Sequence, residues 1–371
     1  MLAPAILRNM SYISQNFEYT IAMRISLLFV FFCFIISYVH TEAFAQRYIG
    51  KDHYNHKTGE FFNTYNKNES SFMEFLKWKF WDGQDAKLWP EWIDNEFEPS
   101  LPISLEDHEV AITFINHATL LIQINGLNIL TDPVWSERVS PVSWIGPKRV
   151  RAPGLDFDRL PKIDLVIISH NHYDHMDLAT LKKISQKHGA TILVPIGDRK
   201  LLQDEGIKNV KSLDWWSTEY FKEKFKVTFT PAQHFSSRGL FDKNESLWGG
   251  YIIRFNDYKI FFAGDTGYSQ HFKDIHKRFG PMDISFLPIG AYAPRWFMKT
   301  VHMNPAEAVK AHQDLKSKYS IGMHFGTFQL TDEAIYKPVE ELQRAKLKNN
   351  IPGGSFGVLD VGQTLLHKLM P

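Results

Sequence analysis

The chain has 371 residues, 14% of them aromatic, and a formal net charge of +1 at pH 7. This length is ample for one large α/β domain, and the near-neutral charge gives no global field that would favour nucleic acid as a partner. The sequence contains no low-complexity segment, short repeat or run of like charge, which excludes repetitive and highly charged disordered proteins.

The first part of the chain has the pattern of a targeting segment. Arg24 precedes an apolar run over 25–39, and an Ala-x-Ala sequence ends at Ala45. This order is typical of a secretory signal peptide cleaved before Gln46, and the run is shorter than the about 20 residues of a spanning helix. We therefore expect residues 1–45 to be an N-terminal extension with a signal peptide, and the protein to be exported, periplasmic or membrane-associated in a bacterium. A retained membrane anchor is the alternative.

Residues 46–108 are rich in aromatic side chains. The stretch 72–81 mixes phenylalanine and tryptophan with two lysines, and 88–92 adds two tryptophans. This composition favours either a helix packed on the domain core or an interfacial surface where rings lie among lipid headgroups. We predict a helical and aromatic segment packed on the core over 46–108, followed by the main domain over 109–371. The single cysteine, Cys33, precedes both, so signal cleavage would leave no disulfides or thiolate ligands.

From residue 109 the chain alternates between strand and helix patterns. Asn125-Gly126 is a strong hairpin turn signal between two short β-rich runs. Strands are predicted at 109–115, 120–124, 127–131, 165–168, 191–194, 227–230, 251–255, 259–263 and 319–323.

Two helices are predicted between these strands. Apolar residues at helical spacing indicate a helix over 177–187 that stops at Gly189. A second helix should begin at Asn304, where a proline follows at the first helical position and Glu307 provides the acid of a capping box. Strands first, then mixed strands and helices, suit an α/β domain with two packed sheets and helices outside them.

Four residues that can bind metal ions lie within six positions after the predicted strand 165–168. They are His170, His172, Asp174 and His175. Imidazole nitrogens and a carboxylate suit a borderline divalent ion such as zinc. Alternation in an extended loop lets the first two histidines reach one ion while the other two residues reach a second. The pattern therefore predicts a dinuclear metal centre.

Two ions need more ligands than one loop supplies. Three further candidates, His234, Asp265 and His324, each come shortly after a run of strand type. Loops that follow several strands of one sheet edge point at a common site. We expect these three residues to complete the ligand set.

These ligands and several neighbouring motifs resemble the metallo-β-lactamase superfamily, and within it the branch of N-acylphosphatidylethanolamine-hydrolysing phospholipase D. The resemblance extends over residues 54–366. Its motifs are Asn116-His-Ala-Thr119, Leu130-Thr-Asp-Pro133, Gly146-Pro-Lys-Arg149, Ser169–His175, Ala263–Tyr268, Gly290–Lys299 and His324–Phe328.

The resemblance implies an αββα metallo-β-lactamase sandwich that holds two Zn²⁺ per chain, with other divalent metals as alternatives. Two cations about 3.5–4 Å apart can lower the pKa of a shared water and hold it as hydroxide for attack on phosphorus. Asp174, Asp265 and His302 are the expected catalytic residues. The implied ligands are His170, His172 and His234 for one ion and Asp174, His175 and His324 for the other, with Asp265 bridging both.

Other residues are expected around the metal ligands. His117 and Asp132 should support the ligands by hydrogen bonding, because the two metal sites are already filled. His302 is a candidate to stabilise the leaving group or a phosphoryl oxygen, with a capping or surface histidine as the alternative. Arg295 and Lys299 are candidates for phosphate binding, with an ion-paired loop as the alternative.

Three positions depart from the family pattern and concern the substrate. Asn116 replaces a usual glycine, and Ser143 and Trp144, which we include as candidate substrate contacts, stand where animal members carry an amide and a tyrosine. We predict a zinc-dependent phosphodiester hydrolase that cleaves N-acylphosphatidylethanolamine to N-acylethanolamine and phosphatidic acid. Its partners would be a phospholipid and a membrane surface, and no nucleic acid. A lactone or other small-ester hydrolase is the alternative enzyme, and a non-catalytic metal- and lipid-binding envelope protein the alternative of another class.

Overall fold

The computed structural model describes residues 52–66, 72–78, 87–222, 224–239 and 241–369. The predicted signal peptide and its cleavage site before Gln46 lie outside these residues. Of the described residues, 61–369 belong to one compact unit and 52–60 to another. The chain between 52 and 61 contains the short strands β1 (Tyr54–Asn55) and β2 (Glu60–Phe61). Among the helices that the structure describes, none has the length and apolar character to cross a membrane.

The first sheet of the larger unit has seven strands in the order β16-β3-β4-β5-β6-β7-β8. Pairing is antiparallel from β16 to β5 and parallel from β5 to β8. Asn125 and Gly126 form the predicted hairpin turn, with φ of 44° and 74°, the left-handed backbone that a type I′ turn requires. The strands are β3 (Glu109–Asn116), β4 (Thr119–Ile124), β5 (Leu127–Thr131), β6 (Leu165–Ile167), β7 (Thr191–Pro195), β8 (Val210–Leu213) and β16 (Thr364–Lys368).

The second sheet also has seven strands, in the order β15-β14-β13-β12-β11-β10-β9. The Tyr251 hydroxyl donates a hydrogen bond of 2.9 Å to the carbonyl of Ile168, which follows β6, so this side chain joins the two sheets across the core. The strands are β9 (Thr218–Phe221), β10 (Phe225–Thr230), β11 (Gly250–Phe255), β12 (Tyr258–Phe262), β13 (Ile284–Pro288), β14 (Tyr319–Met323) and β15 (Phe356–Val358).

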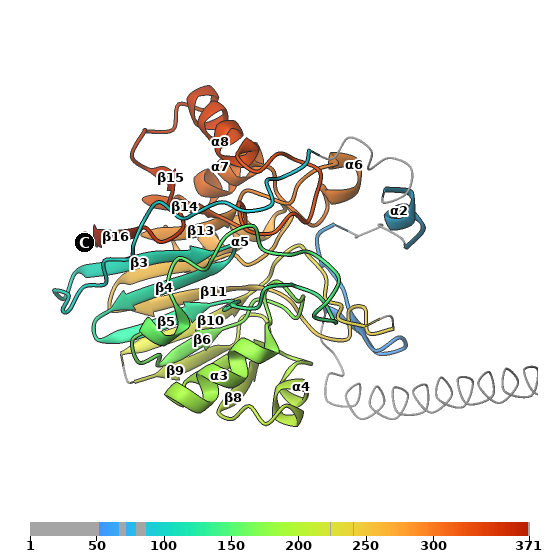
Figure 1. Ribbon diagram of the computed structural model, residues 1–371, viewed down its shortest axis with the longest axis horizontal. Coiled ribbons are helices and arrows are strands. Elements are labelled where there is room, and N and C mark those ends of the chain that lie inside the picture. Colours follow the sequence, from blue (N-terminus) through green and yellow to red (C-terminus); the bar gives the residue numbers. More distant parts are fainter. Residues whose placement is uncertain (1–51, 67–71, 79–86, 223, 240, 370–371) are drawn as a thin grey trace, which may run out of the picture. The chain divides into compact units, whose positions relative to one another are not determined.

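Helices cover the outer faces of the two sheets (Figure 1). Leu181 and Ile184 of α3 share a buried apolar cluster with Val166 of β6 and Ile192 of β7. This helix ends at Gly189, whose φ of 63° is the left-handed cap that the sequence predicted. The helices are α2 (Phe72–Lys77), α3 (Leu178–His188), α4 (Arg199–Asp204), α5 (His271–Phe279), α6 (Arg295–Met298), α7 (Pro305–Asp314) and α8 (Lys337–Lys348), with a 3₁₀ turn η3 (Phe157–Arg159).

Two described tryptophans of the aromatic segment contact the loop that follows β14. The Trp78 indole Nε1 donates to Asp332 Oδ2 at 2.7 Å, and Trp89 Nε1 donates to the carbonyl of Glu333 at 2.9 Å. Both rings keep a partner for their N–H, as buried indoles usually do. These contacts attach the segment to the sandwich beside the end of β14.

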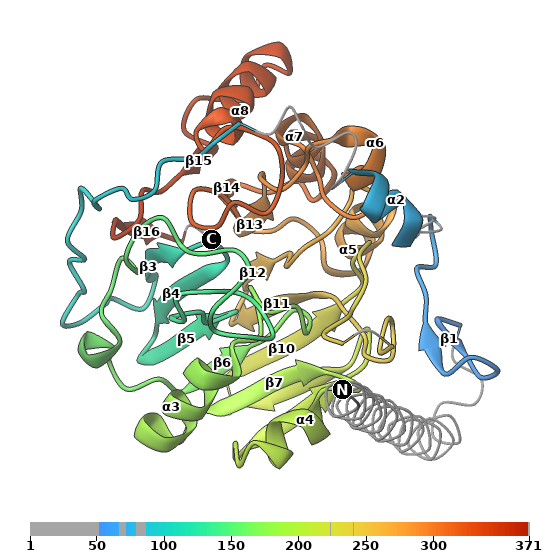
Figure 2. The ribbon, with the colours of Figure 1, turned by 45° about the vertical axis from the view of Figure 1, so that its right-hand side comes forward.

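Two sheets with helices outside confirm the predicted αββα sandwich of the α/β class (Figure 2). The capping box also forms: Glu307 N donates to Asn304 Oδ1 at 2.9 Å, and Asn304 N donates to Glu307 Oε2 at 3.1 Å. The predicted strands occur with small shifts, for example β12 at Tyr258–Phe262 instead of 259–263. The sequence-based prediction missed strands β1, β2, β8, β9, β13, β15 and β16 and helices α4, α5, α6 and α8.

Candidate metal centre

The seven predicted metal ligands lie at one edge of the sandwich, where strands of both sheets end. β6 leads into His170–His175, and β10, β12 and β14 lead to His234, Asp265 and His324. β12, β13 and β14 run parallel, and β10 runs in the same direction because β11 is antiparallel to both β10 and β12. Ligand atoms from these loops therefore approach one another to within 4.8 Å in overlapping groups.

Three imidazoles form the first group of ligand atoms. His172 Nδ1 lies 2.8 Å from His170 Nε2 and 3.3 Å from His234 Nε2. A tetrahedral zinc ion with bonds of about 2.0–2.1 Å keeps its ligand atoms about 3.3 Å apart. The spacing of His172 and His234 matches this value, and that of His172 and His170 is shorter. Burial lowers the pKa of His172 to about 3 and that of His234 to about 4. Both rings are thereby kept neutral, which is the form that binds metal.

Asp174, His175 and His324 form the second group. His175 Nε2 lies 3.2 Å from His324 Nε2 and 3.3 Å from Asp174 Oδ2. Two imidazole nitrogens that face each other at this distance can share a proton or both bind one cation. Burial opposes protonation, yet the nearby carboxylate of Asp265 raises the pKa of His175 well above its usual value and that of His324 to about 9. The negative potential that favours a proton here equally favours a metal cation.

The carboxylate of Asp265 lies between the two groups. Its Oδ2 is 3.0 Å from His324 Nε2, 3.2 Å from His175 Nε2 and 3.9 Å from His234 Nε2. Burial alone would raise the pKa of this carboxyl, but the charges of His175 and His324 hold it well below its usual range. Asp265 is therefore a charged group within reach of ligand atoms from both groups.

Hydrogen bonds behind the ligands fix the orientation of two rings. His175 Nδ1 donates to Asp132 Oδ2 at 2.7 Å, and His170 Nδ1 donates to Ser169 Oγ at 2.8 Å. The Ser169 hydroxyl in turn donates to Asp132 Oδ2 at 2.6 Å. With Nδ1 protonated, each Nε2 directs its lone pair at the cluster. Asp132 thus occupies the supporting position that the sequence predicted, whereas Ser169 was not singled out although it directly precedes the ligand motif.

His234 is oriented by residues from distant parts of the chain. Its Nδ1 donates to the carbonyl of Val301 at 2.9 Å. Asn63 binds its backbone from both sides: His234 N donates to Asn63 Oδ1 at 3.1 Å, and Asn63 Nδ2 donates to the His234 carbonyl at 2.8 Å. Trp248 Nε1 also donates to Asn63 Oδ1, at 3.1 Å. The sequence analysis missed Asn63, which stands in no recognisable motif.

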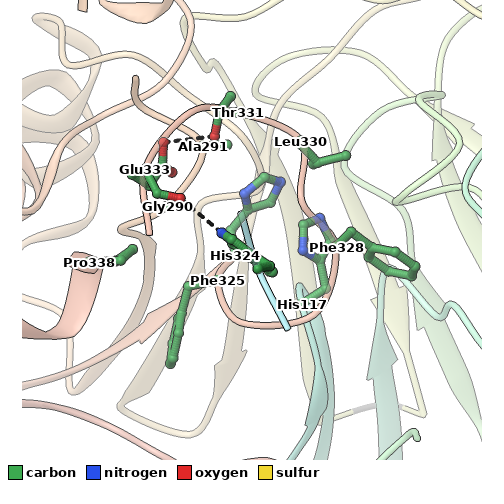
Figure 3. Close-up of a pocket in the computed structure, with 11 residues that line it drawn as sticks. His117, Gly290, Ala291, His324, Phe325, Phe328, Leu330, Thr331, Glu333 and Pro338 are labelled. Carbon is green, nitrogen blue, oxygen red and sulfur yellow. Dashed lines mark hydrogen bonds between the residues drawn. The ribbon is translucent and has the colours of Figure 1, made fainter. Parts of the chain in front are cut away.

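His117 lies beside the second group, in the turn between β3 and β4. Its Nε2 is 2.9 Å from Asp174 Oδ2, and its ring centroid is 3.9 Å from that of His324 (Figure 3). Burial lowers the pKa of His117 to about 4, so a neutral ring donates its Nε2–H to the carboxylate. His117, Asp132 and His324 have φ of 46°, 34° and 63°. Such left-handed backbone costs on the order of 1–3 kcal/mol per residue and tends to cluster at functional sites.

His302 lies at the rim of the cluster. Its Nδ1 is 3.8 Å from Asp265 Oδ2, and its side chain is 12% exposed. Arg295, a candidate phosphate contact from the sequence, donates instead to the His302 carbonyl and to Glu307 Oε2, both at 2.8 Å. This is the ion-paired arrangement foreseen as the alternative. Arg295 therefore supports the backbone that carries His302.

The other candidate substrate contacts lie on the surface. Trp144 is 75% exposed, and Ser143 and Lys299 are exposed as well. Across the described part of the chain, no hydrogen bond, ion pair or ring contact joins these three residues to the metal ligands. Their role in substrate binding remains an expectation from sequence.

This chain is similar to known proteins in both sequence and fold. The model of the beta-lactamase superfamily domain matches residues 127–325, which include all seven ligand positions. The chain is 38% identical over 263 residues to N-acyl-phosphatidylethanolamine-hydrolyzing phospholipase D 1 of Caenorhabditis elegans, covering 68% of this chain and 74% of the relative. It is 30% identical over 238 residues to a metal-dependent hydrolase of Methanopyrus kandleri, covering 62% of this chain and 92% of that protein.

A solved structure supports the fold. The crystal structure of a possible metal-dependent hydrolase from Veillonella parvula matches with a TM-score of 0.58 at 19% identity, covering 69% of this chain and 98% of that one. The ligand cluster, the sandwich and these similarities agree with one another. The chain belongs to the metallo-β-lactamase superfamily, and within it to the metal-dependent hydrolases related to N-acylphosphatidylethanolamine-hydrolysing phospholipase D.

Proposed function

We propose that this protein is a zinc-dependent phosphodiester hydrolase of phospholipase D type, which cleaves N-acylphosphatidylethanolamine to N-acylethanolamine and phosphatidic acid. The observation that carries the proposal is the position of Asp265, whose Oδ2 lies within 3.9 Å of imidazoles from both ligand groups. A carboxylate shared in this way suits a pair of cations, and paired cations suit an anionic phosphodiester. The name of the Caenorhabditis elegans relative supports this substrate.

Two zinc ions per chain are part of the proposal. Bound there, they would lower the pKa of a water and neutralise the charge that develops on the phosphoryl oxygens. The donor set contains only nitrogen and oxygen, which suits zinc and leaves manganese or iron as alternatives. One ion would be held by His170, His172 and His234, the other by Asp174, His175 and His324, with Asp265 shared.

The side chains of the protein contribute orientation and polarity. Asp265 Oδ1 is buried and has no hydrogen-bond partner among the described residues, so it can accept a hydrogen bond from an attacking water and align it. His302 Nδ1 likewise has no such partner, and its position at the rim lets the imidazole donate to a phosphoryl oxygen or to the leaving oxygen. Asp174 is held toward the cluster by the Nε2–H of His117. Preorganised groups of this kind stabilise the transition state without rearranging.

A substrate panel tests the proposed activity. Purified, zinc-loaded protein should hydrolyse N-acylphosphatidylethanolamine in preference to other phospholipids and to lactones. His170→Ala and Asp265→Ala should each lose at least one zinc ion together with activity, while His276→Ala on α5, outside the cluster, should keep both. Turnover of lactones with phospholipids untouched would support the small-ester hydrolase instead. Bound zinc without turnover of either class would support the non-catalytic alternative.

We also propose export across a bacterial membrane. The order of Arg24, the apolar run 25–39 and Ala45 supports it. Mature protein isolated from a bacterial producer should begin at Gln46 and lie outside the cytoplasm. N-terminal sequencing that recovers residues 24–45 from membrane fractions would instead establish an anchor.

A further inference from the structure

An arginine outside the ligand set connects two loops that carry ligands. Arg238 lies four residues after His234, in the connection between β10 and β11. Its Nη1 donates to the carbonyl of Asn171 at 2.7 Å and to the carbonyl of Met176 at 2.9 Å. These two carbonyls stand at either end of the segment 172–175, so one guanidinium spans the run that contains three of the ligands.

Tyr173, in the middle of that run, makes the contact reciprocal. The Arg238 guanidinium carbon lies 4.0 Å from the centroid of the Tyr173 ring, and the Tyr173 hydroxyl donates to the Arg238 carbonyl at 2.8 Å. Each side chain thus holds the backbone or ring of the other residue. A lysine could supply a point charge here, but it lacks the planar fork that stacks on a ring while donating to two carbonyls.

The loop that carries Arg238 is itself fixed by Asp242. The Asp242 carboxylate accepts from Arg238 N at 3.0 Å and from Gly239 N at 2.8 Å. Ser237 N donates to Asn171 Oδ1 at 3.0 Å, which adds a second link to the metal loop. The backbone that carries the Arg238 side chain is therefore fixed by hydrogen bonds of its own.

The metal loop depends on such external contacts because it has little regular structure. Between β6 and α3, its internal backbone hydrogen bonds run from His175 N and Met176 N to the carbonyl of His172. No sheet ladder or helix fixes the direction of the ligands there. Side chains from neighbouring loops have to do so instead.

We propose that Arg238 is a positioning residue of the metal centre, which holds the segment 170–176 against the loop of His234. The inference rests on the metal centre proposed above and adds a residue that binds neither metal nor substrate. Its consequence is that the 3.3 Å spacing between His172 Nδ1 and His234 Nε2 depends on the guanidinium. Replacing a group that orients metal ligands commonly lowers metal affinity by roughly 10–100-fold.

Zinc affinity of the full chain, measured by competition with a chelator, tests the proposal. Arg238→Met should weaken zinc binding by roughly 10–100-fold, and Arg238→Lys and Tyr173→Phe by smaller factors. The matched control is Arg254→Met on β11, whose guanidinium carbon lies 5.3 Å from the Phe279 ring centroid, outside the metal loop. This variant should bind zinc as the wild type does.

Melting temperatures of the metal-free variants separate positioning from general stability. A purely structural role would lower the melting temperature of Arg238→Met while its zinc affinity stays within about twofold of the wild type, and that result would overturn the proposal. If Arg238→Met does not fold, the affinities of Arg238→Lys and Tyr173→Phe decide in the same way. Wild-type protein that binds no zinc would overturn the metal centre itself, which is a distinguishable failure.

Discussion

His175 and Asp132 form a completely buried pair, in which the ring Nδ1 lies 2.7 Å from the carboxylate Oδ2. The bond fixes the tautomer of His175, so that its Nε2 lies toward Asp174 and Asp265 at 3.3 and 3.2 Å. Asp132 directly follows β5, and His175 belongs to the loop after β6. The same contact therefore joins neighbouring strands of the sheet and orients a ligand.

Asp132→Asn should weaken zinc binding by roughly 10–100-fold. Both oxygens of Asp132 accept hydrogen bonds. Oδ1 accepts one from Ser169 N, and Oδ2 accepts one from the Ser169 hydroxyl and one from His175 Nδ1. An amide has only one acceptor oxygen, so one donor of this buried network would face an NH₂ group. Chelator competition measures the loss. Asp204→Asn, in an exposed pair with Lys200, is the control and should bind zinc normally.

Gly264→Ala should lower the free energy of unfolding more than Gly189→Ala does. Gly264 precedes Asp265 and has φ of 60°; an added Cβ would lie 2.5 Å from Ser169 Cβ and 2.8 Å from the Gly249 carbonyl oxygen. Gly189 has nearly the same φ but open space around it. Left-handed backbone alone costs about 1–2 kcal/mol for alanine. Urea unfolding should show that Gly189→Ala lowers the free energy of unfolding by about this amount and that Gly264→Ala lowers it by clearly more. Gly264→Ala should also weaken zinc binding. Equal losses would contradict the close approach of the two loops.

Stability should fall between pH 7 and pH 5 because of His271, which is buried at the start of α5 and outside the ligand cluster. Burial lowers the pKa of His271 to about 3, against about 6.5 in an unfolded chain. Below pH 6.5 the unfolded state therefore binds a proton that the folded state does not. This contribution to stability is fully present above pH 6.5 and is lost as the pH falls toward 3. At pH 5 the loss amounts to about 2 kcal/mol.

Urea unfolding of His271→Gln at the two pH values checks this prediction. The protein is kept metal-free with a chelator. Between pH 7 and pH 5 the free energy of unfolding should then fall by about 2 kcal/mol less in the variant than in the wild type. His276→Gln, on the same helix, serves as the control for removal of a histidine. If the free energy of unfolding falls equally in the wild type and in His271→Gln, the pH dependence does not come from His271.

The ligand cluster could be predicted from sequence because each ligand follows a strand. The strands that lead to His170, His234, Asp265 and His324 are β-rich runs that end shortly before the ligand, so local pattern and site coincide. Arg238 could not be found in this way. Its guanidinium donates hydrogen bonds to backbone carbonyls, which leave no trace in residue type or spacing.

Asn63 could not be predicted for the same reason, and it is also far from its partner in the sequence. It lies 171 positions before His234, and its hydrogen bonds to that residue are to backbone atoms. Strand β13 was missed for another reason: every residue of Ile284–Pro288 is buried. A parallel strand covered on both faces shows no alternation of apolar and polar residues, so its period does not distinguish it from a buried helix segment.

The central claim is that the enzyme attacks phosphorus in an N-acylphosphatidylethanolamine, and hydrolysis in oxygen-18 water tests it most directly. Zinc-loaded protein is incubated with the lipid, and both products are analysed by mass spectrometry. Attack on phosphorus predicts one solvent oxygen in the phosphate of phosphatidic acid and none in the N-acylethanolamine. Label in the N-acylethanolamine hydroxyl or in a released fatty acid, or in a lactone-derived acid with phospholipids untouched, would contradict it.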